Sequence, residues 1–374
     1  MRVWVANGLT NLAWRAMALL TLACVAAAAY AQATPASSAA TPAYEYFAIG
    51  NTATPTHAKT SPGLMLMGGG RDLDAAFKWF AEQAGHGHIV ILAASGADDL
   101  QKYVYHDVGG VASVQTLVFH ARAPASDPRV LAIVRHADGI FIRGGDQANY
   151  VRFWKGTPLN RLLNAHVRAG KPIGGTSAGL AILGEWGYGA MDGGSIKSDA
   201  ALADPVGSAV TLVDHFMQLH LLQGTITDTH FVQRQRLGRL LAFVARLAHD
   251  HHTAAITGLG VDQDSVLLVD ASGHARFLSW HPDGHAWVVI PRRLREVEHA
   301  GGRAALDAFL RARVSAGKPL DLPGFEVIWI GTGSSLELPG YKIRNPDFRR
   351  RIDVVDGSMR EIAPGSPAAA PRKP

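Results

Sequence analysis

Short apolar runs of strand length alternate along the first half of this chain with longer segments of helical spacing. The apolar runs are residues 63–67, 88–92, 114–119 and 139–142, and the helical segments are 74–83 and 98–107. Strands that are buried on both faces are continuously apolar, and helices that link parallel strands cover both faces of the sheet. The sequence therefore predicts an α/β fold, a three-layer αβα sandwich around a mostly parallel sheet.

Further apolar runs in the second half indicate antiparallel additions to that sheet. Residues 254–259 and 265–269 are typical of paired strands. Residues 275–289 predict a hairpin that turns around Pro282, Asp283 and Gly284. No internal repeat accompanies them.

The N-terminal stretch has the pattern of a cleavable signal peptide. Arg2 and Arg15 precede the apolar run 16–29, and small residues follow it. We expect a signal peptide over 1–33, cleaved after Ala31 or Ala33, and a secreted or periplasmic product without stable membrane association. A membrane anchor is the alternative, but the run is shorter than the roughly 20 residues that span a bilayer. A lipoprotein signal would use Cys24, where Thr21 is a poor match.

Length and composition fit one large globular domain, or two small ones, behind this leader. The chain has 374 residues, of which 48% are hydrophobic and 18% charged, so it can bury a sizeable core. We predict a flexible lead-in over 34–43, one α/β domain over 44–362, and a disordered Ala/Pro/Gly tail over 363–374. The sequence leaves open whether the protein is a homodimer.

Charge and cysteine content exclude several classes of function. The net charge is +5, but the basic residues are dispersed, which argues against nucleic-acid binding. Cys24 is the only cysteine and lies in the expected signal peptide, so neither a disulfide nor a thiol nucleophile is expected. The histidine pairs at 86–88 and 251–252 lack a matched ligand set, and we predict no metal and no cofactor.

The segment 171–183 carries the strongest motif, a Gly-Thr-Ser-Ala-Gly sequence at the end of an apolar run. A glycine-flanked serine between a strand and a helix is typical of a nucleophile elbow. Ser177 is the candidate nucleophile, and the N–H of Ala178 at the helix start is a candidate oxyanion donor. A serine that merely caps a helix is the alternative.

Two further segments supply partners for this serine. Arg-Gly-Gly-Asp-Gln follows the run 139–142, and Gly145 is our candidate for the second oxyanion donor, although an ordinary tight turn has the same composition. His230 follows the apolar run 219–226, and a neutral imidazole is a suitable base for a serine hydroxyl. Arg236 or Arg239, on one helix face, could bind a substrate carboxylate.

Together these three segments resemble the cyanophycinase family of serine peptidases, relatives of aspartyl dipeptidase, over residues 63–269. The resemblance implies a class I glutamine amidotransferase-like fold and exopeptidase cleavage of cyanophycin, a poly-aspartate that carries arginine on its side-chain carboxyls, to β-Asp-Arg dipeptides. It implies that Ser177 is the nucleophile and His230 the base. It also implies a set of pocket residues: Gln147, Asp228, Arg234, Arg236 and Arg239.

The chain departs from the family pattern at two positions. A glutamate completes the family's triad, and Gln263 stands in its place within Gly-Val-Asp-Gln-Asp-Ser. Either Gln263 orients the imidazole, or Asp262 or Asp264 takes this role; an amide cannot stabilise an imidazolium charge as a carboxylate does. Thr229 replaces the glutamine of cyanophycin-degrading members and is a further candidate for substrate binding.

Two other functions remain compatible with the sequence. One is an aspartyl or isoaspartyl dipeptidase that acts on small peptides. The other is a catalytically silent binding protein with the same fold, which the glutamine at 263 favours.

Overall fold

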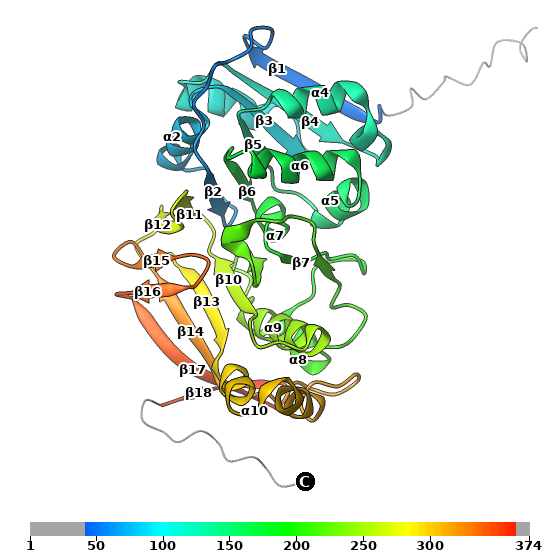
Figure 1. Ribbon diagram of the computed structural model, residues 1–374, viewed down its shortest axis with the longest axis vertical. Coiled ribbons are helices and arrows are strands. Elements are labelled where there is room, and N and C mark those ends of the chain that lie inside the picture. Colours follow the sequence, from blue (N-terminus) through cyan, green and yellow to red (C-terminus); the bar gives the residue numbers. More distant parts are fainter. Residues whose placement is uncertain (1–41, 364–374) are drawn as a thin grey trace, which may run out of the picture. The chain divides into compact units, whose positions relative to one another are not determined.

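The computed structural model describes residues 42–363, whose strands form two sheets (Figure 1). The expected signal peptide, residues 1–33 with Cys24, lies outside this range. None of the helices within 42–363 has the length and apolar character needed to cross a membrane.

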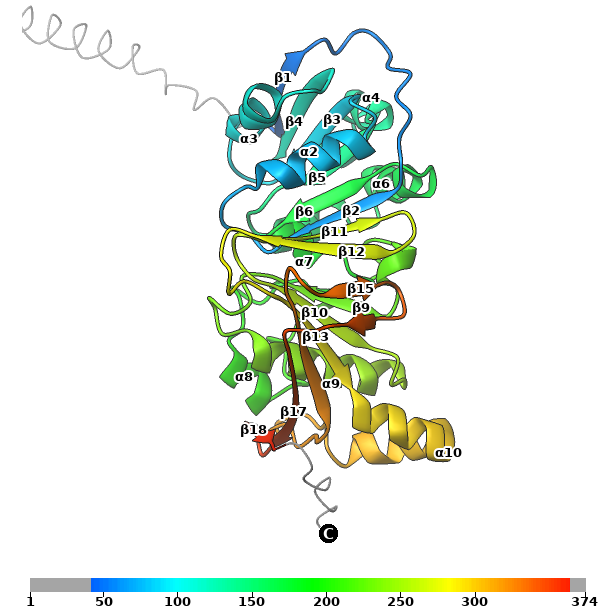
Figure 2. The ribbon, with the colours of Figure 1, turned by 90° about the vertical axis from the view of Figure 1, so that its left-hand side faces the viewer.

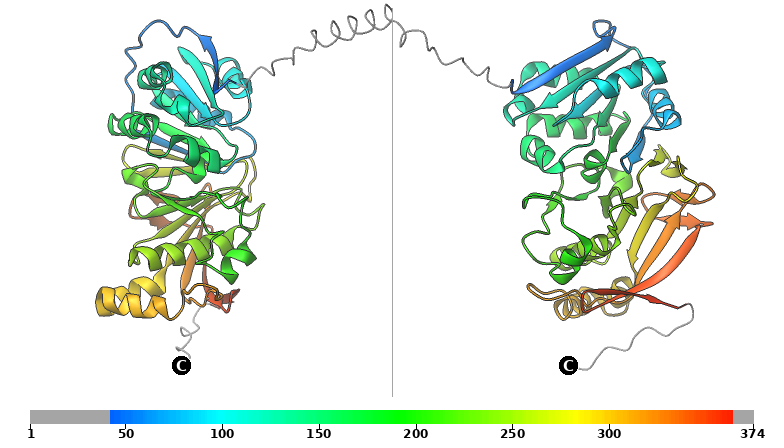
Figure 3. Two further views of the ribbon diagram at one scale, coloured as in Figure 1. Left: turned by 90° about the vertical axis from the view of Figure 1, so that its right-hand side faces the viewer. Right: turned by 180° about the vertical axis from the view of Figure 1, so that it is seen from behind.

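The first sheet has ten strands and a parallel centre. Their spatial order is β1 (Tyr44–Gly50), β4 (Ser113–Phe119), β3 (His88–Ala93), β5 (Gly139–Ile142), β6 (Ile173–Thr176), β2 (Gly63–Met67), β11 (Ser265–Asp270), β12 (His274–Ser279), β15 (Ser335–Glu337) and β16 (Lys342–Arg344). The five strands from β4 to β2 are parallel, and antiparallel strands extend both sides. In Figure 3, the blue β1 lies along the outer edge of this sheet.

Helices cover both faces of the parallel centre. They are α2 (Asp74–Gln83) and α3 (Asp99–Lys102) on one face, and α4 (Pro128–His136), α5 (Gln147–Trp154) and α6 (Pro158–Arg168) on the other. Figure 2 shows α2 in front of the strands and α4 and α6 behind them. Short helical turns join these elements: a π-helix (Tyr103–Val108) and a 3₁₀ turn (Ala123–Ser126). This three-layer arrangement confirms the predicted α/β fold class.

The second sheet has eight strands. Their order is β18 (Ser358–Ile362), β17 (Phe348–Val355), β14 (Phe325–Ile330), β13 (Ala286–Pro291), β10 (Thr257–Val261), β9 (Thr225–Asp228), β7 (Trp186–Tyr188) and β8 (Leu212–Asp214). One of its faces is covered by α8 (Ser198–Ala203), α9 (Leu237–His251) and α10 (Arg292–Arg311). Two further short elements lie between β6 and β9 in the chain: α7 (Ala178–Ala181) directly after β6, and a 3₁₀ turn (His220–Leu222) directly before β9.

The two predicted strand pairings in the second half are wrong. β10 and β11 belong to different sheets, and so do β12 and β13. Instead β11 pairs with β12 through a turn at 271–273, and β10 pairs with β13. Both arms of one long hairpin therefore switch sheets, at 262–264 and 280–285, as Figure 2 shows. The turn residues at 282–284 mark this switch, because a change of direction between sheets needs the same residue types as a hairpin turn.

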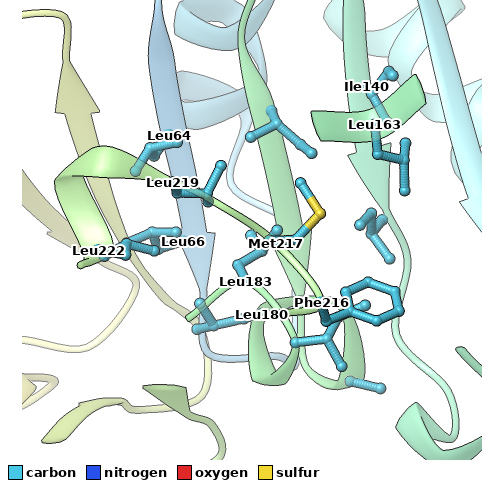
Figure 4. Close-up of a cluster of buried hydrophobic side chains, with 14 of the residues drawn as sticks. Leu64, Leu66, Ile140, Leu163, Leu180, Leu183, Phe216, Met217, Leu219 and Leu222 are labelled. Carbon is cyan, nitrogen blue, oxygen red and sulfur yellow. The ribbon is translucent and has the colours of Figure 1, made fainter. Parts of the chain in front are cut away.

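The main core joins the parallel sheet to the segment before β9. Figure 4 shows Leu64 and Leu66 of β2 beside Leu219 and Leu222, with Met217 near Leu183. All six side chains are buried. Burying an aliphatic side chain stabilises the fold by about 1.5–3 kcal/mol. This packing therefore fixes the positions of β2 and of the segment around α7.

Candidate active site

Ser177 lies on a strained turn between β6 and α7. Its φ is 52° and its ψ −118°, a backbone conformation that residues other than glycine rarely adopt. The flanking glycines allow the close approach that this turn requires. A Cβ on Gly175 would lie 2.6 Å from the Gly179 carbonyl carbon, and one on Gly179 would lie 2.1 Å from the Ile142 oxygen. The chain therefore needs glycine at both positions to present the serine hydroxyl at the carboxyl end of the sheet.

His230 follows β9 and meets this hydroxyl. Ser177 Oγ lies 2.7 Å from His230 Nε2, and the backbone N–H of His230 donates to the Gly68 oxygen at 2.8 Å. On the other side of the ring, Nδ1 lies 2.7 Å from Gln263 Oε1. An amide oxygen only accepts, so Nδ1 carries the proton and Nε2 is free to accept from the serine.

The two aspartates beside Gln263 bind elsewhere. Asp262 accepts from the backbone N–H groups of Val232 and His285, and Asp264 accepts from that of Arg71. Of the three residues that the sequence left as alternatives, Gln263 is the one in contact with the imidazole.

Burial keeps the imidazole neutral. It lowers the pKa of His230 to about 4, the Gln263 hydrogen bond opposes this, and the cations Arg234 and Arg236 lower the pKa further. His230 is therefore in its base form at neutral pH.

The two candidate oxyanion donors are the backbone N–H groups of Gly145 and Ala178. Gly145 follows β5 with a φ of 148°, and Ala178 begins α7. Both line a cavity together with Ser177. Within residues 42–363 neither N–H donates to a protein acceptor, as an oxyanion site requires.

Cavities adjoin the serine on two sides. The first, of about 470 Å³, is lined by residues that include Gln147, Arg152, Ser195, Thr229, Arg234 and Arg236. The second, of about 550 Å³, is lined by residues that include Gly69, Asp72, Asp99 and Arg143. Ser177, His230, Gly145 and Arg234 line both. The Arg234 guanidinium has no ion-pair partner among the described residues.

Two of the predicted pocket residues, Asp228 and Arg239, line neither cavity. Each has only 2% of its side chain exposed, and Arg239 Nε and Nη2 donate to the two Asp228 oxygens at 2.8 and 2.5 Å. Arg236 Nη1 lies 3.4 Å from Asp228 Oδ1 and donates to the Thr229 carbonyl at 2.7 Å. Arg236, rather than Arg239, thus lines the first cavity. The buried pair of Asp228 and Arg239 contacts Arg236 through Asp228.

Asp228→Asn is expected to lower the free energy of unfolding by about 3–5 kcal/mol, because it leaves the Arg239 cation buried without a counter-charge. Chemical denaturation measures this. Asp99→Asn is the matched control: the Asp99 side chain is 68% exposed where it pairs with Arg143, and its loss should cost about 1 kcal/mol or less. Equal losses for the two variants would contradict the assignment of Asp228 as a buried support.

Sequence reasoning missed several cavity residues, among them Asp72 and Arg143, and it also missed Gly69, which contacts the imidazole. Its φ is 102°, and a Cβ there would lie 2.4 Å from His230 Cε1. The run Gly68–Gly70 after β2 was the available signal, because consecutive glycines at a strand end indicate close approach of another group. No group of three or more potential ligands lies together as a metal site in residues 42–363.

A serine on a strained turn, hydrogen-bonded to a neutral imidazole and sharing a cavity with two residues whose N–H groups donate to no protein acceptor within 42–363, is the arrangement of a serine-type hydrolase. Residues 64–274, more than half of the chain, match the model of Peptidase family S51. The chain belongs to Peptidase family S51, which confirms the predicted resemblance.

Several curated relatives that match carry the name cyanophycinase. Those of Synechococcus elongatus and Thermosynechococcus vestitus are each 34% identical over 215 residues, covering 56% of this chain and 61% of the relative. The match thus spans about three fifths of their length. Among solved structures, a peptidase from an acI-B1 Actinobacterium aligns with a TM-score of 0.48 and 15% identity, over 74% of this chain and 97% of that chain.

Proposed function

We propose that this protein is an exported serine exopeptidase that hydrolyses cyanophycin to β-Asp-Arg dipeptides through an acyl-enzyme on Ser177. The observation that carries the proposal is the continuous hydrogen-bonded series from Ser177 Oγ through His230 to Gln263, at 2.7 Å for each contact. The cyanophycinase relatives support the substrate. Export rests on the signal-like sequence of residues 1–33.

In the proposed reaction, Ser177 Oγ attacks the scissile carbonyl carbon while His230 Nε2 accepts the hydroxyl proton. The N–H groups of Gly145 and Ala178 stabilise the negative oxygen of the tetrahedral intermediate. His230 then gives its proton to the leaving amine, the C–N bond breaks, and an ester remains on Ser177. Water, deprotonated by His230, hydrolyses this ester and restores the serine hydroxyl.

The charges of the two cavities suit a substrate with both signs of charge. Arg234 and Arg236 at the first cavity can pair with a free carboxylate of the polymer. Asp72 faces the second cavity, where burial raises its pKa to about 6. Ionised at neutral pH, it can pair with a guanidinium of the neighbouring unit.

The direct test incubates the purified protein with cyanophycin and identifies the products by mass. β-Asp-Arg dipeptide is the expected product, and Ser177→Ala is the matched control. A fluorophosphonate probe tests the nucleophile separately. If Ser177 is labelled but no dipeptide appears, the hydrolase proposal stands and the substrate proposal fails.

A second candidate is an aspartyl dipeptidase that acts on small peptides. The observation that favours it is Thr229 in the wall of the first cavity, where its short side chain replaces the glutamine of the cyanophycin-degrading pattern. Release of free aspartate from a soluble β-aspartyl dipeptide, with no attack on polymer, would support this candidate.

Gln263→Glu is expected to raise kcat about tenfold at pH 8, because a carboxylate stabilises the imidazolium that forms in the transition state. It also raises the pKa of His230. Since His230 is a base only above its pKa, wild-type activity should fall with pH only near 4, whereas the variant should already lose activity near pH 6. The pH profile of kcat/KM measures both effects.

Gln263→Leu is the control for this prediction, because it has similar size without an acceptor and should lower activity. A folded Gln263→Glu variant without activity would contradict the orienting role of Gln263. An unlabelled Ser177 in both the wild type and Gln263→Glu would favour a catalytically silent binding protein.

A further inference from the structure

Residues beyond the family match reach the loop that carries Gln263. The match ends at residue 274, whereas Trp287 lies on β13 and His285 on the preceding connection between the two sheets. Both contact Asp262, the residue before Gln263. The strand switch between the sheets brings these segments together.

Asp262 is a buried junction between three pieces of chain. The residue is only 1% exposed. Its Oδ1 accepts from the Val232 N–H at 2.9 Å and from Trp287 Nε1 at 3.0 Å. Oδ2 accepts from the His285 N–H at 3.0 Å. One carboxylate thus connects the chain just after His230, the chain just before Gln263 and the C-terminal part of the second sheet.

Aromatic packing reinforces the same junction. The ring of Phe231, next to His230, covers Gly260, where a Cβ would lie 2.4 Å from the ring. The Phe231 and Trp287 ring centroids are 5.3 Å apart. Trp287 therefore contacts the neighbours of both catalytic residues. It packs against Phe231, next to His230, and it donates a hydrogen bond to Asp262, next to Gln263.

We infer that Trp287, through Asp262, is a positioning residue that holds Gln263 Oε1 against His230 Nδ1. The inference rests on the proposed function, because it assigns a role in orienting the catalytic base. Trp287 touches neither the serine nor the cavities. Its indole N–H fixes the carboxylate to which the segments of His230 and Gln263 are both attached, and a shift of that carboxylate changes the contact between the two side chains.

The test is Trp287→Phe, which keeps an aromatic ring against Phe231 and removes only the indole N–H. We expect kcat and the rate of Ser177 labelling by a fluorophosphonate each to fall about tenfold, with KM changed by less than about twofold, as for one lost hydrogen bond to a buried charge. Trp329→Phe is the matched control. Trp329 lies beside Trp287, with ring centroids 4.7 Å apart, and its Nε1 has no hydrogen-bond partner within residues 42–363. The control should keep both rates within about twofold of wild type.

The outcomes separate this inference from the proposed function. If wild-type Ser177 reacts and Trp287→Phe reacts as fast as Trp329→Phe, the positioning role is wrong and the hydrolase proposal stands. A lower melting temperature for Trp287→Phe with unchanged kcat would also overturn it, because the contact would then be only structural. If Ser177 is not labelled in the wild type, the proposed function itself fails. Should Trp287→Phe not fold, Asp262→Asn makes the same test with the same expected loss.

Discussion

Ser177→Ala is expected to lower peptide hydrolysis by about five orders of magnitude while the protein stays folded. The hydroxyl of Ser177 hydrogen-bonds to His230 and is the attacking group, so without it no acyl-enzyme forms. Alanine has the same Cβ, so the strained backbone at φ 52° is no more costly in the variant than in the wild type. Steady-state kinetics, with circular dichroism as the folding check, measure the effect.

The matched control for this variant is Thr176→Ser, one residue earlier on β6. Thr176 lines the second cavity but is not in hydrogen-bond contact with the imidazole. We expect it to change kcat by less than about tenfold. Turnover by Ser177→Ala close to that of the wild type would end the assignment of Ser177 as nucleophile.

Gly69→Ala is expected to lower kcat by about a hundredfold, because the added methyl group displaces the imidazole from the serine. A Cβ on Gly69 would lie 2.4 Å from His230 Cε1 and 2.5 Å from Nε2, far closer than two carbon or nitrogen atoms can approach. Loss of Ser177 labelling by a fluorophosphonate probe would report this displacement without any peptide substrate.

Gly317→Ala separates this steric effect from backbone strain. Gly317 also has a positive φ, 67°, but nothing lies within 4 Å of the added Cβ. The control should therefore share a cost of about 1 kcal/mol in stability and retain full activity. Equal activity of the two variants would show that the imidazole tolerates a methyl group at position 69.

Local sequence was sufficient for the elements that carry chemistry. The predicted strands Gly63–Met67 and Gly139–Ile142 and the helix Asp74–Gln83 have the same bounds in the structure. Buried parallel strands are continuous apolar runs, and a helix shows its own period, so neither needs distant residues for its recognition.

Pairing and burial could not be predicted in the same way. The strands β10 and β11 are adjacent in sequence, yet their apolar patterns do not say that they join different sheets. Asp228 and Arg239 were expected in the pocket, but their buried pairing with each other depends on how α9 packs against β9. The sequence does not show whether a charged residue lies in a cavity wall or in a buried ion pair.

The sequence by itself determined the α/β class, the turn that bears Ser177 and the candidacy of His230, because each depends on contiguous residues. Only the tertiary structure decided that Gln263, and neither neighbouring aspartate, touches the imidazole. That choice depends on two backbone N–H groups, of Val232 and His285, and the Trp287 indole N–H, which hold Asp262 away from the imidazole. The spacing of residues along a chain does not determine which side of a loop its side chains face once two sheets pack around it.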